Sequence, residues 1–420
     1  MAKRRGNGEG SITKRKSDGR WQGYVTVGYD VETGKPKKKY FYGKTRKEVQ
    51  EQVNKTLGNV QAGTYREPSK LTMAEWLTSW LNDYMRPSLR PTTWESYKTQ
   101  VDKHILPALG HLRLSQLQTS DLQALYNQKL QGGRADGKKE CVICGKASTQ
   151  KNVKVCPECG GDLKEVGLSP RSVRYIHVVI HAALEQAKKE GMITINVADA
   201  VKLPSDPKKE IQVLDQEGIK KFLAAARETK HFPAYFLAIN TGLRRGELLG
   251  LRWRDVDLRE GTVTVTQGLV RTKGGLTFQE PKTKLSNRTI GVSPQVVSTL
   301  KEHKKWQNEE RLAAGTAYNT EHDLVFCNEL GEPICPRGFT RHFERVLKRA
   351  GLEGKVTFHG MRHTFATLSL QEGAAARTVQ EALGHHKAAF TLDVYSSVTS
   401  KMKKEATDRI GSLLASCLGE

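Results

Sequence analysis

The sequence has 420 residues, and its 68 Lys and Arg against 45 Asp and Glu give a net charge of +23. This length predicts two to four domains, and so large a positive excess favours a polyanionic partner, nucleic acid first of all. Nowhere do 18 apolar residues run together and no apolar segment follows the basic start, which excludes a membrane span and a secretory signal. We therefore expect a cytoplasmic protein with no membrane partner and, despite its seven cysteines, no disulfide framework.

Residues 1–64 predict a small domain in which a three-stranded sheet packs on one helix. Residues 20–27 and 37–42 alternate as strands do, and Thr45 is a candidate helix N-cap. Most charge runs are merely solvated, but basic side chains interleaved with aromatic ones on one ribbon favour contact with DNA. The residues expected to make that contact are Arg20, Lys37, Lys38 and Lys39.

Apolar residues recur at spacings of three and four between residues 71 and 203, which predicts a bundle of helices. One helix has clear ends, because Ser169 is an N-cap candidate, Pro170 suits the first helical position and Gly191 suits the position after the last. The proline-containing segment 203–209 predicts a linker to a further domain, 211–420.

An insertion at 132–167 interrupts this bundle and holds four of the seven cysteines in two Cys-x2-Cys pairs, 11 residues apart. Zn²⁺ takes four thiolates in a tetrahedron, and each two-residue gap lets one tight turn supply two of them. We expect one structural Zn²⁺ in a zinc-ribbon-like segment, with no role in catalysis because a closed shell leaves no position for substrate. Cys327, Cys335 and Cys417 are predicted to be ordinary small apolar residues. The expected ligands are Cys141, Cys144, Cys156 and Cys159.

Residues 211–420 contain the groups needed to attack a phosphodiester without a metal. Arginine clamps phosphate oxygens, lysine and histidine move protons, and tyrosine can form a covalent phosphotyrosine. The sequence has neither the dense carboxylate cluster of a two-metal site nor a Walker loop. The six candidate catalytic residues are Arg244, Lys282, His359, Arg362, His385 and Tyr395.

Taken together, these motifs resemble the tyrosine recombinases, in particular the integrases of temperate phages and conjugative transposons. The resemblance rests on the segments 241–253, 281–288, 359–364 and 383–385 together with Tyr395. It implies a multidomain, mainly α fold with small β-sheets. The three parts would be a sheet-plus-helix domain for arm-type DNA sites (1–64), a helical domain for core-type sites (71–203) and a mixed α+β catalytic domain (211–420).

The resemblance also implies a role for each residue around the scissile phosphate. Arg244 and Arg362 would clamp its oxygens, and His385 would donate a hydrogen bond to one of them. Lys282 would be the general acid that protonates the leaving 5′ oxygen. His359 would assist proton transfer at the nucleophile.

Tyr395 would attack, giving a 3′-phosphotyrosine and a free 5′-hydroxyl, so that neither ATP nor a catalytic metal is needed. Glu247 would brace the site from behind the arginines. The resemblance further implies a homotetramer that synapses two double-stranded DNA attachment sites, with an excisionase or a host DNA-bending protein as a further partner.

The sequence departs from the family pattern at three positions besides the cysteine insertion. Gly360 stands where an acidic residue is common, Met361 where leucine is usual, and Ser397 where histidine is frequent. His386 directly follows His385 and is the alternative phosphate ligand. Two other functions stay open, a DNA-binding regulator that kept a recombinase scaffold and a topoisomerase-like enzyme that nicks and closes DNA.

Overall fold

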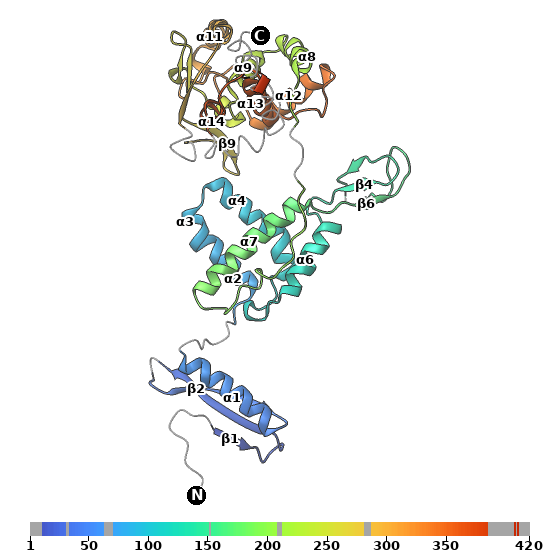
Figure 1. Ribbon diagram of the computed structural model, residues 1–420, viewed down its shortest axis with the longest axis vertical. Helices are drawn as coiled ribbons and strands as arrows, with labels where there is room; N and C mark the ends of the chain where they lie inside the picture. Colours follow the sequence, from blue (N-terminus) through green and yellow to red (C-terminus); the bar gives the residue numbers. More distant parts are fainter. Residues whose placement is uncertain are drawn as a thin grey trace. The chain divides into compact units, whose positions relative to one another are not determined.

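The computed structural model describes residues 11–30, 33–62, 70–150, 153–207, 212–280 and 287–384, together with residues 407, 408 and 410. The chain forms two compact units, Met1–Asp206 and Pro207–Glu420, and the division lies in the segment expected to be a linker. The described part is mainly helical with small sheets, so the predicted fold class is confirmed (Figure 1). Within the described ranges, no helix is long and apolar enough to cross a membrane.

The N-terminal part is an antiparallel sheet in the order β1-β2-β3, packed against one helix (Figure 1). Thr45 caps that helix through a capping box, because its side chain accepts from the Glu48 N–H while the Glu48 carboxylate accepts from the Thr45 N–H. Val25, Val49 and Val53 form a small core between sheet and helix. The elements are β1 (Ser11–Lys14), β2 (Trp21–Tyr29), β3 (Pro36–Gly43) and α1 (Arg46–Gln61).

Residues 70–207 form a helical bundle around its longest helix, which buries one continuous apolar face. Ser169 caps that helix by accepting from the Ser172 N–H at 3.2 Å, as its sequence predicts. Trp76 Nε1 donates to the Ala183 carbonyl at 3.0 Å and so fastens the first helix to the longest one. The helices are α2 (Met73–Ser79), α3 (Arg86–Ser88), α4 (Pro91–Gln100), α5 (Leu106–Leu109), α6 (Thr119–Gln131) and α7 (Pro170–Lys189), with π-helical turns at Trp80–Met85 and Val101–Ile105.

The cysteine insertion is a small antiparallel sheet between α6 and α7, in the order β5-β4-β6 (Figure 1). Its two ends meet where the Leu168 N–H donates to the Lys129 carbonyl at 2.6 Å. Glycine is required at Gly167, because a Cβ there would lie 1.8 Å from the Leu130 carbonyl oxygen. The strands are β4 (Lys139–Cys141), β5 (Ala147–Ser148) and β6 (Leu163–Glu165).

The C-terminal unit packs helices around an aromatic core that includes Phe222, Tyr235 and Phe343, beside a sheet of order β11-β8-β7 and the hairpin β9-β10. Its helices are α8 (Gln216–Arg227), α9 (Phe232–Thr241), α10 (Arg245–Leu249), α11 (Pro294–Ala314), α12 (Pro336–Arg349), α13 (Phe358–Gln371) and α14 (Ala376–Leu383). Its strands are β7 (Val256–Asp257), β8 (Thr262–Val265), β9 (Gly268–Thr272), β10 (Gly275–Gln279) and β11 (Arg288–Gly291).

Candidate active site

A tight turn between α9 and α10 delivers Arg244 to the site. Gly242 ends α9 with a φ of +63°, and a Cβ at this position would lie 2.6 Å from the Phe365 ring and 2.8 Å from a Leu383 methyl. Only glycine meets both the left-handed backbone and this close approach without displacing a neighbour. Arg244 then occupies the N-cap of α10 with its side chain 40 % exposed.

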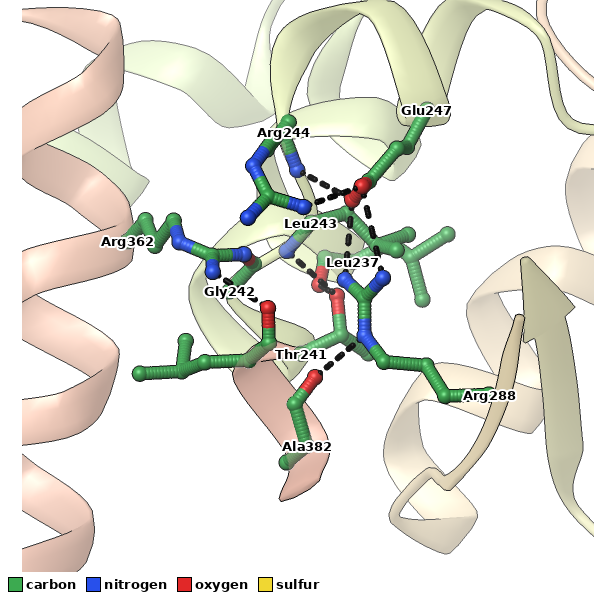
Figure 2. Close-up of polar contacts among 10 residues, drawn as sticks. Leu237, Thr241, Gly242, Leu243, Arg244, Glu247, Arg288, Arg362 and Ala382 are labelled. Carbon is green, nitrogen blue, oxygen red and sulfur yellow. Dashed lines mark hydrogen bonds and ion pairs between the residues drawn. The ribbon is translucent and has the colours of Figure 1, made fainter. Parts of the chain in front are cut away.

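Glu247 lies between two arginines, as Figure 2 shows. Its carboxylate accepts from Arg244 Nη1 at 2.6 Å and from the Arg244 backbone N–H at 2.9 Å. Arg288, the first residue of β11, donates to the same carboxylate at 2.8 Å and 3.3 Å and to the Ala382 carbonyl at 2.6 Å. Burial alone would raise the pKa of Glu247, but the hydrogen bond and charge of Arg288, with Arg244, outweigh it and hold the pKa below its usual value.

Arg362 reaches the same turn from α13. Its side chain is almost fully buried, with Nη1 donating to the Gly242 carbonyl at 2.8 Å and Nη2 donating to the Leu383 carbonyl (Figure 2). These two carbonyls belong to the ends of α9 and α14. Arg362 therefore ties three helices together and is itself fixed in position.

His359 lies one turn before Arg362 on α13, and its ring meets that of His363 edge-on at a centroid distance of 5.0 Å. Partial desolvation of the ring, then the charges of Arg362 and Arg244, lower the pKa of His359. The pKa of His363 falls to about 4 for similar reasons, burial first and then the charges of His359 and Arg362. Both imidazoles are therefore neutral at pH 7 and able to accept a proton.

The structure thus brings Arg244, Glu247, His359 and Arg362 into one region, while Lys282, His385 and Tyr395, with His386 and Ser397, lie outside the described residues. Two participants were missing from the predicted set. Arg288 neutralises Glu247 from β11, and although it ends the 281–288 motif, nothing in the sequence assigned it a role. His363 lies against His359, and helical spacing of four could have identified it.

Gly360, where the sequence departs from the family pattern, is explained by close packing. A Cβ there would lie 2.4 Å from Val356 Cγ2 and 3.2 Å from the Gln212 carbonyl oxygen. Met361 beside it is buried in the core of the unit. These two substitutions therefore change the packing under α13 and not the groups that face the site.

The four cysteines of the insertion converge, with all their sulfur atoms within 4.8 Å of one another. Cys141 and Cys159 Sγ lie 3.3 Å apart, and Cys144 and Cys156 Sγ lie 3.6 Å apart, too far for disulfides of about 2.05 Å. Four sulfurs at about 2.3 Å from one Zn²⁺ in a tetrahedron would be about 3.8 Å apart, so the cluster fits that ion. Each pair sits on the same kind of turn, closed by a left-handed glycine, Gly145 or Gly160.

The prediction that the other cysteines are ordinary apolar residues is wrong for two of them. Cys327 Sγ accepts from Gln307 Nε2 at 2.8 Å, inside a polar cluster. Cys335 is the N-cap of α12, and its pKa is lowered by the backbone N–H groups of Gly338 and Arg337, then by Arg271. Cys417 lies outside the described residues.

The predicted DNA-contact lysines do not share one face of the N-terminal sheet. Lys38 lies on the open face, with Nζ 4.7 Å from the Tyr24 ring centre. Lys39 lies on the face that packs against α1, beside Phe41. Of the four residues, Arg20, Lys37 and Lys38 are exposed and Lys39 is half-buried.

A basic chain that gathers two arginines and a neutral histidine in a helical unit with a small sheet has the features of a DNA strand-transfer enzyme. Residues 212–402 match the phage integrase family, and residues 72–130 match the N-terminal SAM-like domain of phage integrases. A tyrosine recombinase XerC-like protein of Caldanaerobacter subterraneus subsp. tengcongensis is 29 % identical over 407 residues, covering 93 % of this chain and 95 % of the relative.

Two solved structures share the fold. The Tn1549 transposon integrase in complex with transposon right end DNA is 20 % identical and matches with a TM-score of 0.62 over 80 % of this chain and all of that one. A lambda integrase tetramer bound to a Holliday junction is 19 % identical and matches with a TM-score of 0.52 over 90 % of this chain and 94 % of that one. The chain belongs to the phage integrase family of tyrosine recombinases, and it is a site-specific DNA recombinase.

Proposed function

We propose that this recombinase is the integrase of a mobile element, which it inserts and excises through a 3′-phosphotyrosine on Tyr395. The observation that carries the residue assignment is the hydrogen bond of Arg362 to the Gly242 carbonyl, in the turn that also delivers Arg244. His359 lies one turn before Arg362 on α13, so two guanidinium groups and an imidazole meet in one place. A planar guanidinium matches the two non-bridging oxygens of a phosphodiester and offsets the charge of its transition state.

In this proposal the protonation states of the histidine and lysine side chains determine which of them accepts a proton and which donates one. His359 is neutral at pH 7 because its pKa is lowered, so it can take the proton of the attacking tyrosine hydroxyl. Lys282 gives a proton to the leaving 5′ oxygen, and His385 donates a hydrogen bond to a phosphate oxygen. The phosphoryl group passes from the DNA 5′ oxygen to the tyrosine oxygen, and the reverse attack by a 5′-hydroxyl reseals the strand.

Glu247 acts as a positioning residue in the same proposal. It holds Arg244 by two hydrogen bonds, and Arg288 neutralises it from the far side. The clamp is therefore set before DNA arrives, which spares the cost of organising it during the reaction.

We further propose that the four-cysteine cluster holds one structural Zn²⁺. The convergence of four sulfurs on two matching turns supports this assignment, and the donor set is the one that Zn²⁺ prefers. When bound, the ion would join the two turns of the insertion, and strand transfer itself would need neither a metal nor ATP.

For the assembly, we propose a homotetramer on two synapsed DNA sites in the cytoplasm of the host. Residues 1–64 would bind arm-type sites, residues 71–203 core-type sites, and residues 211–420 the scissile phosphate, with an excisionase or host DNA-bending protein setting direction. Deleting residues 1–64 should abolish integration and spare cleavage of a core site. Unimpaired integration by the deletion variant would contradict the arm-binding assignment.

The catalytic assignment is tested by Arg244→Lys, which keeps the charge and loses the planar fork. Covalent protein–DNA adduct on a nicked core-site substrate should form about 100- to 1,000-fold more slowly, the usual loss when one transition-state donor is removed. Arg377→Lys, an exposed arginine of α14, is the matched control and should leave the rate unchanged. An unchanged rate in Arg244→Lys would remove Arg244 from the clamp.

A further inference from the structure

The four-cysteine cluster contains two close sulfur pairs, and each pair joins one turn of the insertion to the other. Cys141 Sγ lies 3.3 Å from Cys159 Sγ, and Cys144 Sγ lies 3.6 Å from Cys156 Sγ. In both pairs the first cysteine belongs to one Cys-x2-Cys turn and the second to the other. Because a disulfide bond is about 2.05 Å long, the sulfurs would have to approach by roughly 1.3 Å in the first pair and roughly 1.6 Å in the second to be linked.

Each pair combines one exposed cysteine with one buried cysteine. Cys159 and Cys144 are exposed, whereas their partners Cys141 and Cys156 are buried. A small oxidant in the solvent can therefore reach one sulfur of each pair, and the other sulfur lies within contact distance of the first. An oxidised cysteine condenses to a disulfide when a second thiol is close enough to react with it.

The two cysteines described in the C-terminal unit have different neighbours. The sulfur of Cys327 contacts Gln307 and Tyr318, and that of Cys335 contacts Arg271. In the described part of the chain, neither contact offers a second sulfur. Oxidation at these positions would therefore stop at a sulfenic acid, whereas the insertion is built to form disulfides.

We propose that the cluster is a peroxide-sensitive modification site, at which two cross-turn disulfides, Cys141–Cys159 and Cys144–Cys156, replace bound Zn²⁺. The inference rests on the zinc assignment made under the proposed function. A cysteine that holds a metal is a thiolate, which is the nucleophilic form of the side chain. Disulfides in a reducing cytoplasm are transient and redox-sensing, which fits a site that alternates between a metal-bound and a disulfide form.

The chemistry needs hydrogen peroxide and no other reactant. The exposed thiolate of a pair attacks one peroxide oxygen, so that the O–O bond breaks, a sulfenic acid forms and hydroxide leaves. The buried thiolate then attacks the sulfenic sulfur, so that the S–S bond forms and a second hydroxide leaves. Each pair thus gives two electrons to one peroxide molecule, and once both pairs have reacted no thiolate remains to hold Zn²⁺.

The structural change should stay within the insertion, because the bonds at its base involve no cysteine. The Leu168 N–H donates to the Lys129 carbonyl at 2.6 Å, and Lys129 Nζ donates to the Gly133 carbonyl at 3.1 Å. The Gly133 N–H donates in turn to the Glu165 carboxylate at 3.3 Å. These contacts hold the ends of α6 and α7 together in either form, so the helical bundle should keep its structure after oxidation.

The test treats the full-length, zinc-loaded protein with hydrogen peroxide. Released Zn²⁺, measured with a coloured chelator, should reach about one ion per chain after about two equivalents of peroxide. Peptide mapping by mass spectrometry should find the two cross-turn disulfides, and dithiothreitol with added Zn²⁺ should restore the metal-bound form. Hydrogen exchange should change within residues 139–165 and stay unchanged in α7.

Three variants separate the cluster from the other thiols. Cys327→Ser and Cys335→Ser are the matched controls, because each removes a described thiol outside the cluster, and both should release Zn²⁺ as the wild type does. Cys159→Ser removes the exposed member of one pair. Peroxide should then form the Cys144–Cys156 disulfide alone.

The other outcomes count against the proposal. Zinc retained under peroxide, or disulfides that form within one Cys-x2-Cys turn or between chains, would overturn it. Faster exchange in α7 after oxidation would contradict the confinement of the change to the insertion. A chain isolated without zinc would contradict the metal assignment instead, and mapping the disulfides of that chain would still decide which sulfurs pair.

Discussion

The ion pair between Arg288 and Glu247 offers the sharpest test of how the site is organised. Arg288 has a side chain 6 % exposed and Glu247 one 10 % exposed, so both charges depend on each other for solvation. Arg288→Met keeps most of the side-chain volume and removes the charge. Glu247 then retains only Arg244, which is 40 % exposed and correspondingly weaker as a partner.

The expected loss follows from the contacts that disappear. Removing one partner of a buried ion pair lowers the free energy of unfolding by about 3–5 kcal/mol. Because Arg244 still pairs with Glu247 in Arg288→Met, we expect a loss at the lower end of this range. The Ala382 carbonyl also loses its 2.6 Å hydrogen bond, which costs roughly 1 kcal/mol more. We therefore expect the free energy of unfolding of the C-terminal unit to fall by about 3–4 kcal/mol.

Hydrogen exchange followed by mass spectrometry measures this unit separately from the rest of the chain. Amides of α9, which lies in the core of the unit, should exchange more than 100-fold faster in Arg288→Met at pH 7. Arg377→Met is the matched control, because Arg377 and Glu381 form an ion pair of 3.0 Å that is 86 % and 67 % exposed. The control should change the free energy of unfolding by less than about 0.5 kcal/mol.

The direction of the Glu247 pKa shift determines how the free energy of unfolding changes with pH. The lowered pKa of Glu247 contributes stability that is present above its unfolded value of about 4.3 and is lost as pH falls through its folded value. Without Arg288, burial raises the pKa of Glu247 and this contribution disappears. A loss below 1 kcal/mol in Arg288→Met, or strict additivity with Glu247→Gln, would refute the reasoning.

Three further predictions concern other parts of the molecule. Burial is the main cause that lowers the pKa of His231 to about 4, so its contribution to stability is complete above pH 6.5 and is lost as pH falls. Urea unfolding should therefore show a free energy of unfolding up to about 2 kcal/mol lower at pH 5 than at pH 7. His231→Phe should abolish this difference. Gly360→Ala should lower the free energy of unfolding, measured by calorimetry, by about 1–3 kcal/mol, because its new methyl group meets Val356. Adding Val356→Ala should restore part of this loss, and no restoration would contradict the packing argument. Native mass spectrometry should find one Zn²⁺ per chain. Cys156→Ser should lose the ion, and its hydrogen exchange should become faster only at residues 139–165. A metal-free wild type would contradict the zinc assignment.

Local signals in the sequence predicted much of this fold. Thr45, Ser169 and Pro170 mark helix starts correctly, because a cap depends only on neighbouring residues. The strands β2 and β3 of the N-terminal sheet and the strand beginning at Arg288 follow from residue patterns and turn residues in the same way, whereas β1 was not identified by such a pattern. The four cysteines converge because their spacing fixes two turns, which also needs no distant partner.

What the sequence did not predict depends on residues far apart in the chain. Arg288 meets Glu247 across 41 positions and Ala382 across 94, and no local pattern records such pairs. The packing limit at Gly360 appears only once Val356 folds against α13. Cys335 is a different case, because its lowered pKa comes first from the backbone N–H groups of Gly338 and Arg337 and only then from the distant Arg271, and Pro336 after it is a local sign of a helix start.

The central claim is covalent DNA strand transfer by Tyr395, and one gel measures it. Wild type and Tyr395→Phe are incubated with nicked DNA from the junction flanking this gene, without Mg²⁺ or ATP, then denatured and separated. A covalent adduct that the variant loses is the predicted result. Retarded DNA without any adduct would indicate a binder that does no chemistry, and an adduct that persists in the variant would place the nucleophile elsewhere.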